Sequence, residues 1–515
     1  MANPRFMPLV RKPVERQPDG PTRHFVGRTH ELGEVRAAID DARAGRGRLV
    51  LFTGEPGIGK TRLADEAETL AAVKGMRARW GRCWEGGGAP AHWPWIQVIR
   101  EVIAESNAPP VRPRNLAAEI ARILPELASQ ACEPETHINA EAARFRLFDS
   151  VATLLKEAAR AHPMVIILDD LHDADMASLQ MLQFLARVLH NAHVLIIGTY
   201  REAEMRRSTE RSALMDEIVR DAVPLPLAAL TESEVGDLVA GRATGAPASG
   251  IVAELHRATA GNPLFVDGVL RALAAEGRLG GGACIDLAGF TLPDSVRGAV
   301  RRRLGLLSAA ARAVLTTAAV IGQESAHALV AQVHGHAADT LAALMGEAAA
   351  MGIVGVAGPS SSRFTHPLLR EALYDDLEAG ERTRLHRQVA AALESLHRAN
   401  VTPCLAELAH HWRAGAEAPE DIEKAIDYAI RAGDAASAVF AYEGATGHFR
   451  VAVELAAQQG GNLLRRAELF VRLGAVTTHL DSVDSITCFE NALAMFEQLG
   501  LAERAIHCRA KLAAV

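Results

Sequence analysis

The residues with the clearest chemistry form a glycine-rich loop between an apolar run and an amphipathic one. Residues 54–61 read Gly-Glu-Pro-Gly-Ile-Gly-Lys-Thr, which satisfies the G-x-x-x-x-G-K-[ST] pattern of a phosphate-binding loop. Glycines let successive backbone N–H groups point at a phosphate, and the start of the following helix adds a favourable dipole. Lys60 is expected to bridge the β and γ phosphates of ATP, and Thr61 to ligate Mg²⁺. The candidate nucleotide contacts here are Gly54, Glu55, Pro56, Gly57, Ile58, Gly59, Lys60, Thr61 and Arg62.

A pair of aspartates supplies the other half of such a site. Asp169 and Asp170 follow four apolar residues at 165–168, which predict a buried strand. Ligands of parallel sheets bind at the carboxyl ends of the strands, and Mg²⁺ is usually held by a carboxylate together with phosphates. We expect Asp169 to ligate the metal and Asp170 to polarise the attacking water. Taken alone, the pair could equally cap the next helix; together with the loop it favours metal binding.

The elements that would position these groups alternate along the first half of the chain. Apolar runs at 48–53, 164–168 and 193–199 predict parallel strands, with amphipathic helical stretches between them. Residues 25–226 are therefore expected to form an α/β P-loop domain. Residues 227–280 are expected to form a helical lid, whose first helix opens with a capping box of Thr231 and Glu234.

The second half of the chain is predicted to be mainly helical. A glycine-rich stretch at 277–284 marks a boundary, and three helical segments followed by a hairpin at 353–365 predict a winged helix over 290–378. From 379 to 515 the pattern is helical, and Phe449 and Ala452 recur forty positions later as Phe489 and Ala492. Such a period predicts TPR-like helical repeats, so the fold class is multidomain, with an α/β nucleotide-binding part and α-helical repeats.

Composition excludes several classes of protein. The net charge of −7 and the pI near 6.3 give no bulk attraction to nucleic acid or to anionic membranes. Six scattered cysteines, no apolar leader and no long apolar run predict a cytoplasmic protein without a membrane span. Residues 1–24 are rich in proline and basic residues, which predicts a disordered arm. The pairs His410-His411 and His334-x-His336 lack acidic or cysteine partners at metal spacing, so packing or exposure is the preferred interpretation. Mg²⁺ is the one metal expected.

These motifs, in this order, resemble the signal-transduction ATPases with numerous domains (STAND), a branch of the AAA+ superfamily. The likeness is greatest to the large ATP-binding regulators of the LuxR type and extends over residues 25 to about 455. It rests on the phosphate loop and acidic strand together with Phe-Val-Gly-Arg at 25–28, Gly-Thr-Tyr-Arg-Glu at 198–202, Gly-Asn-Pro at 261–263 and the segment 363–374. One departure is Asp173, which stands where the family usually has tryptophan.

The resemblance implies further roles that the residues alone do not establish. It places Val26 and Arg28 near the adenine, makes Arg201 a sensor of the γ-phosphate, and lays Pro263 against the base. Without the resemblance, Arg201 would be interpreted as a surface arginine in an ion pair, and Gly261-Asn-Pro263 as a helix-breaking turn.

The winged helix is not expected to read DNA. The helix before the hairpin, at 338–351, carries two acidic residues and no basic one, whereas a recognition helix presents Arg, Lys, Asn or Gln to base edges. Members of the family end in a separate helix-turn-helix, and none is recognisable before Val515. The chain is therefore expected to be either a truncated form or a shortened relative that acts through a partner.

The leading expectation is a slowly hydrolysing ATP-dependent signalling switch, part of a transcriptional regulator, with nucleotide-controlled self-association and an unknown inducer or protein partner on the repeats. Two alternatives remain open. One is an interaction scaffold in which the nucleotide is structural, and the other is an energy-coupling AAA+ ATPase that acts on nucleic acid.

Overall fold

The computed structural model describes residues 25–515, except for 85–87, 106–113, 131–139, 242–250, 276–300, 302–303, 359 and 461. The predicted basic arm at 1–24 and the glycine-rich boundary at 277–284 lie outside the described residues. The predicted end of the lid at 280 and the predicted start of the winged helix at 290 therefore remain predictions.

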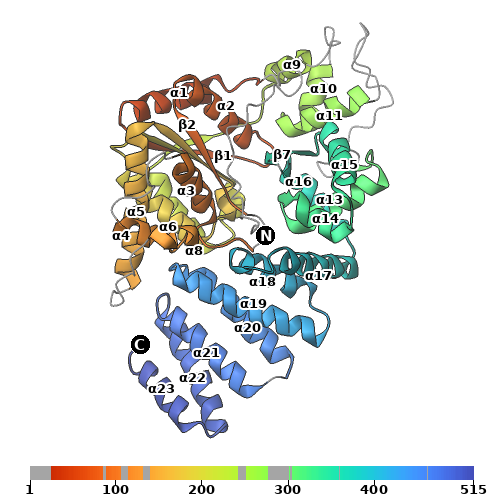
Figure 1. The fold of residues 1–515 in the computed structure, drawn as a ribbon. Helices are drawn as coiled ribbons and strands as arrows, with labels where there is room; N and C mark the ends of the chain where they lie inside the picture. The colour runs from red at the N-terminus through yellow and green to blue at the C-terminus, as the bar shows by residue number, and fades with distance from the viewer. Residues whose placement is uncertain are drawn as a thin grey trace, which may run out of the picture.

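A five-stranded parallel sheet forms the centre of the first part of the chain (Figure 1). Its order is β2-β3-β4-β1-β5, so the phosphate-loop strand β1 and the acidic strand β3 flank β4. The strands are β1 (Arg48–Thr53), β2 (Arg77–Arg82), β3 (Met164–Asp169), β4 (Val194–Tyr200) and β5 (Val223–Pro226). All ladders are parallel, and the loops at the carboxyl ends of the strands therefore meet along one edge.

Alternate residues of the three central strands, β3, β4 and β1, enter two different cores. Val50 and Phe52 face one side with α1 and α2, whereas Leu49 and Leu51 face the other with α3, α5, α6 and α8. The helices that cover the sheet, with the short helical turns between them, are α1 (Thr29–Arg43), α2 (Lys60–Val73), α3 (Trp93–Glu105), α4 (Arg114–Ile120), η1 (Pro125–Gln130), α5 (Ala140–Ala161), η2 (Leu171–Asp173), α6 (Met176–Val188), α7 (Glu202–Met205) and α8 (Thr209–Arg220).

The apolar pattern predicted three strands correctly and did not reveal two. β2 reads Arg-Ala-Arg-Trp-Gly-Arg, and its arginines conceal a strand at one edge of the sheet. β5 reads Val-Pro-Leu-Pro, and prolines are tolerated there because β5 is the other edge.

The helical segment after the sheet contains α9 (Glu232–Ala240), α10 (Ile251–Thr259) and α11 (Pro263–Ala275). The predicted capping box is present. The Thr231 hydroxyl accepts a hydrogen bond from the Glu234 N–H, and the Glu234 carboxylate accepts one from the Thr231 N–H at 2.8 Å.

Next comes a small helical unit with a three-stranded antiparallel sheet of order β6-β8-β7. Its elements are α13 (Ala309–Ile321), β6 (Glu324–Ala326), α14 (His327–His334), α15 (Ala338–Ala350), β7 (Val354–Gly358), β8 (Ser361–Phe364) and α16 (Pro367–Asp375). A helix, the short strand β6, two more helices and a hairpin follow one another in this order, as in a winged helix. The prediction had the three helices and the hairpin but not β6. Arg301, which precedes α13 in the chain, pairs with Asp376 at the end of α16 at 3.0 Å, so its charge is used within this unit.

The remainder is an array of stacked helices, each packed on the next (Figure 1). The elements are α17 (Ala379–Leu396), η3 (Thr402–Cys404), α18 (Leu405–Gly415), α19 (Pro419–Ala438), α20 (Tyr442–Gln458), α21 (Leu463–Thr477), α22 (Ser482–Gln498) and α23 (Ala502–Leu512). The residues that recur in the predicted repeat make the same packing contact in each pair of helices. Phe449 covers Gly433 of the preceding helix, and Phe489 covers Gly474 in the same way, because a Cβ at either glycine would lie within 3.0 Å of the ring. The array is thus TPR-like.

The array also packs against the nucleotide-binding part. Ala177 of α6 shares a core with Tyr442 and Phe449 of α20, and the Gln180 amide donates to Glu443 at 3.2 Å. The array therefore docks on the α6 side of the nucleotide-binding part. Within the described ranges, none of the helices combines the length and the apolar character needed to cross a bilayer.

Candidate nucleotide-binding site

The loop after β1 folds as a phosphate cradle. Gly57 and Gly59 have φ values of +79° and +102°, which side chains other than glycine rarely adopt. A Cβ at Gly59 would meet nothing within 4 Å, so its surroundings are open, whereas a Cβ at Gly57 would collide with Asn262 and Leu264 of the lid. α2 begins directly at Lys60, and its first N–H groups point along the loop.

Lys60 is buried in this cradle, with 7% of its surface exposed. Its ammonium donates to the carbonyls of Gly54 at 2.8 Å and Glu55 at 3.0 Å. Burial, and then the positive charge of Arg201, lower the pKa of Lys60 to about 8, even though Asp169 and Asp170 act in the opposite direction. A buried cation that donates to loop carbonyls fits a site for an anionic phosphate chain.

Asp169 and Thr61 meet where a Mg²⁺ ion would bind. The Thr61 hydroxyl lies 3.0 Å from Oδ1 of Asp169, and Asp169 is fully buried at the end of β3. The Thr199 hydroxyl of β4 donates to the same Oδ1 at 2.7 Å and accepts from the Asp170 N–H at 2.9 Å. Thr199 therefore fixes both aspartates, a positioning role that the sequence did not reveal.

Two arginines place positive charge beside Asp169. Nη2 of Arg363, on β8 of the winged helix, lies 3.5 Å from Oδ2 of Asp169. Arg82 ends β2 at the position paired with Asp169 in the sheet. Burial is the largest influence and raises the pKa of Asp169, but the charges of Arg363 and Arg82 and the hydroxyls of Thr199 and Thr61 together hold it below its usual range. Asp169 is therefore ionised in this arrangement.

Asp170 differs from its neighbour. Its backbone is left-handed, with φ at 60°, which turns the chain away from the strand as it enters η2. Burial, and then the charge of Asp169, raise the pKa of Asp170 to about 6, while His172 and Arg201 act in the opposite direction. A carboxyl with a pKa just below neutrality is suited to accept a proton from water.

Arg201 lies at the end of β4 and is buried, with 8% of its surface exposed, rather than on the surface. Its Nη1 donates to Glu204 at 2.7 Å, and Glu204 also approaches Nε2 of His172 at 3.1 Å. The hydrogen bond from His172 is the largest influence on Glu204, and with Arg201 it lowers the pKa of Glu204 to about 2. Arg201 is thus part of the charge network around Lys60 and Asp170, and its role as γ-phosphate sensor stays a prediction.

The segment before α1 covers the entrance to the loop. Arg28, at φ 60°, donates to the Ile58 carbonyl at 3.1 Å and to the Ala228 carbonyl, and pairs with Glu31 at 3.1 Å. Beside it, Val26 lines an open pocket of about 460 Å³ between this segment and α9. The residues around the pocket are Phe25, Val26, Gly27, Asp237, Ala240 and Gly241. Its place beside the loop agrees with the predicted adenine position, which remains untested.

The lid contacts the phosphate loop directly. The Asn262 amide donates to the Pro56 carbonyl at 2.9 Å, and Pro263 begins α11 immediately after it. Arg62, by contrast, pairs with Glu66 at 2.6 Å and lies over the Phe25 ring at 5.7 Å. The Gly-Asn-Pro segment is therefore more than a turn, because its asparagine joins the lid to the loop.

The residues present thus fit a magnesium–nucleotide complex. Lys60 and the loop N–H groups would hold the phosphates, and Thr61 and Asp169 would hold Mg²⁺, whose charge would stabilise the leaving phosphate oxygens. Sequence reasoning did not reveal Arg82. It recognised the segments that contain Thr199, Asn262 and Arg363 without giving these three residues a role in the site. The sheet register, which brings Arg82 level with Asp169, is the signal that could have identified Arg82.

Comparisons with known proteins agree with this geometry. Residues 24–197 match the family model of the AAA ATPase domain. An uncharacterized protein of Rhizobium meliloti is 23% identical over 93% of this chain and 48% of its own length. The chain thus spans about half the length of that curated relative.

Among solved structures, a STAND protein with a tetratricopeptide repeat sensor from Pyrococcus horikoshii is 14% identical, with a TM-score of 0.47 over 95% of this chain and 80% of that one. Cdc6p of Pyrobaculum aerophilum, at 15% identity, gives a TM-score of 0.33 over 70% of this chain and 97% of that one. The phosphate loop, the acidic strand and the matched residues lead to one conclusion: the chain carries an AAA ATPase domain, a nucleotide-binding module, at residues 24–197.

Proposed function

We propose that this protein is a STAND-type ATP-dependent switch, in which nucleotide exchange opens a closed packing of the ATPase domain, winged helix and repeats and permits self-association. An unknown inducer or protein partner would act through the repeats. Slow hydrolysis would return the molecule to the closed form.

The observation that carries the proposal is the contact between Arg363 and Asp169. A winged-helix cation lies 3.5 Å from the carboxylate that would ligate Mg²⁺, and Asp169 is fully buried. An arginine and a divalent cation compete for the same oxygen, because both satisfy its charge. Binding of Mg-ATP would therefore weaken the docking of the winged helix, and docking would weaken the binding of Mg-ATP, by reciprocal coupling.

Each residue of the site has a proposed part. Lys60 neutralises the phosphates, Thr61 and Asp169 position the metal, and Asp170 orients and deprotonates water. Arg201 senses the γ-phosphate through its place between Lys60 and Glu204. Val26, Arg28 and Pro263 border the base.

The test is the solution mass of the purified chain by light scattering, with Mg-ADP and with a non-hydrolysable Mg-ATP analogue. The proposal expects a rise in mass with the ATP analogue that Lys60→Ala abolishes. Nucleotide binding without any change in mass or in interdomain packing would contradict the switch.

The Asp170→Ala variant distinguishes the proposed switch from two other functions. A switch would stay in the ATP form, because hydrolysis resets it. A scaffold with a structural nucleotide would be unaffected, and an energy-coupling ATPase would lose substrate-stimulated turnover.

Transcriptional output is proposed through a partner. On α15, Glu347 accepts hydrogen bonds from the Ser308 N–H at 2.6 Å and the Ser308 hydroxyl at 2.8 Å, so it serves the winged-helix fold. With Asp339 as the other charged residue, α15 carries no Arg, Lys, Asn or Gln for base edges.

A further inference from the structure

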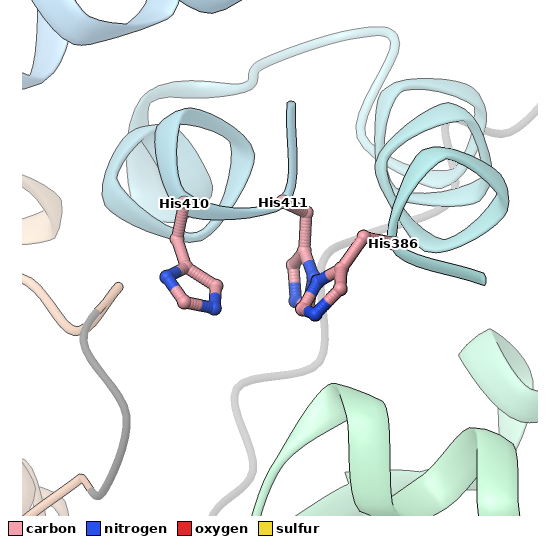
Figure 2. A group of neighbouring side chains, drawn as sticks. All are labelled: His386, His410 and His411. Carbon is pink, nitrogen blue, oxygen red and sulfur yellow. The ribbon is translucent and has the colours of Figure 1, made fainter. Parts of the chain in front are cut away.

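Three histidines from two neighbouring helices meet where the winged helix joins the array (Figure 2). His386 comes from α17, and His410 and His411 come from α18. One ring nitrogen of each lies within 4.8 Å of those of the other two. His386 and His411 are buried, and the His410 ring is partly exposed. In the sequence, His410 and His411 have no third histidine nearby. In the folded chain His386, which lies twenty-four positions before His410, is beside them.

The ring centroids, as distinct from the hydrogen-bonded Nδ1 atoms, have the spacing of a metal shell. The ring centroids are 5.0 Å apart for His386 and His411, 5.1 Å for His410 and His411, and 5.5 Å for His386 and His410. Zinc binds imidazole nitrogen at about 2.0–2.1 Å, which puts each centroid about 3.2 Å from the ion. At tetrahedral angles, two such centroids are about 5.2 Å apart. The three observed distances bracket this value.

Hydrogen bonds inside the protein hold two of the rings, whereas the third ring, that of His410, is partly exposed to solvent. Nδ1 of His386 and Nδ1 of His411 are 2.8 Å apart, and Nε2 of His386 lies 2.9 Å from the Tyr374 hydroxyl. These contacts form a chain from Tyr374 to His411 in which each ring is neutral. Within the described part of the chain, no hydrogen bond reaches the His410 ring, although it lies against both of the others.

The surroundings favour neutral imidazoles, the form that binds metal. Burial lowers the pKa of His386 to about 4, and burial also lowers the pKa values of His410 and His411. With Nδ1 of His386 on a metal, its Nε2–H would donate to Tyr374, the usual outer contact of a ligating histidine. The charges of Arg413 and Arg370 also lower the pKa of His410. Glu407 lies one helical turn before His411, and burial raises the pKa of its carboxyl to about 7.

We propose that His386, His410 and His411 bind a divalent transition metal ion of the zinc type, with the fourth coordination position open to solvent. The ion would fasten α17 to α18. A Cβ at Gly88, in the ATPase domain, would lie 3.3 Å from the Cβ of His410, so the fastened pair is the surface on which residue 88 packs. The site is independent of the proposed nucleotide switch.

The experiment uses the full chain, freed of metal with a chelator and kept without nucleotide. Zn²⁺ binding is measured by competition with a chromophoric chelator, Co²⁺ is used for the visible bands of a tetrahedral ion, and Zn K-edge absorption counts imidazoles. The expected result is one ion per chain with three imidazole ligands. His410→Gln should lower the Zn²⁺ affinity at least about tenfold.

His336→Gln is the matched control, since His336 stacks on His334 at a centroid distance of 5.3 Å in a pair without a third ligand. It should leave Zn²⁺ affinity unchanged. His410→Gln keeps the Tyr374–His386–His411 chain, so the fold, checked by circular dichroism, is retained. Unchanged Zn²⁺ binding in His410→Gln would overturn the proposal. So would a spectrum with one imidazole, which would assign the ion to the other cluster of His172, Asp173 and Glu204.

Discussion

Arg363 and Asp169 belong to two different sheets and are separated by 194 positions in the chain, yet Nη2 of the arginine lies 3.5 Å from Oδ2 of the aspartate. The aspartate is fully buried, and the arginine side chain keeps 18% of its surface exposed. The contact joins the winged helix to the metal side of the nucleotide site. Substitution of Arg363 would therefore remove this contact between the two domains without changing the nucleotide site itself.

Arg363→Ala should loosen the closed form and strengthen Mg-ATP binding, because Asp169 loses its competing cation. The free energy of unfolding should fall by about 1–2 kcal/mol, since Thr61, Thr199 and Arg82 still partner the carboxylate. Calorimetric titration with Mg-ATP and thermal unfolding measure the two effects. Arg312→Ala, which breaks an exposed pair with Asp376 at 3.2 Å inside the winged helix, is the control and should leave Mg-ATP affinity unchanged.

Hydrolysis should increase with pH around 6. Burial raises the pKa of Asp170 to about 6, so the carboxylate needed to accept a proton forms only above that pH. Asp170→Asn should lower the hydrolysis rate by about 100-fold or more and flatten the increase of the rate with pH.

The free energy of unfolding should change with pH in the opposite direction to the hydrolysis rate. A raised carboxyl pKa favours folding at low pH, and that contribution is lost as pH increases through 6, so Asp170→Asn should be at least as stable as the parent at pH 7. If Asp170→Asn hydrolysed ATP at the parental rate, Asp170 would not be the group that accepts the proton.

Nucleotide affinity should decrease above about pH 8. Burial, with Arg201, lowers the pKa of Lys60 to about 8, and a neutral amine no longer attracts the phosphates. Because bound phosphates favour the charged form, the nucleotide complex should titrate at a higher pH than the free protein. Binding isotherms of Mg-ADP at several pH values test this expectation. Lys60→Ala should bind weakly with little pH dependence in the same range.

Asn262→Ala should speed nucleotide release. The change removes the 2.9 Å hydrogen bond from the lid to the Pro56 carbonyl, worth about 1 kcal/mol, which corresponds to roughly a fivefold change in rate. Stopped-flow release of a fluorescent ADP analogue measures the effect. Asn491→Ala, which removes an exposed bond inside α22, is the control. Equal release rates in both variants would mean that the lid does not limit dissociation.

Phe489→Ala should destabilise the array by about 3–5 kcal/mol, because the ring is 1% exposed and fills the space above Gly474. Val483 on the same helix is 68% exposed, so Val483→Ala should change stability by less than about 0.5 kcal/mol. Chemical denaturation of the two variants provides the comparison.

The candidate site residues that are consecutive in the chain could be predicted from the sequence. The loop at 54–61 and the aspartates after β3 carry their roles in consecutive residues, and the capping box at Thr231 is likewise local. Thr199 and Arg82 lie beside Asp169 only because of the strand order, and Arg363 reaches it only through domain docking. The third histidine at 386 depends on how two helices pack. Such long-range partners have no signature in the spacing of residues along a single chain.

The bond between Asn262 and Pro56 also has a kinetic meaning. The loop is held in shape before any phosphate arrives, so less conformational entropy is lost on binding. The same bond prevents the loop from relaxing independently of α11, and we therefore expect the residence time of the nucleotide to be set by lid opening. If the proposed switch is correct, a brief pulse of inducer would leave a signal that persists for as long as the lid stays closed.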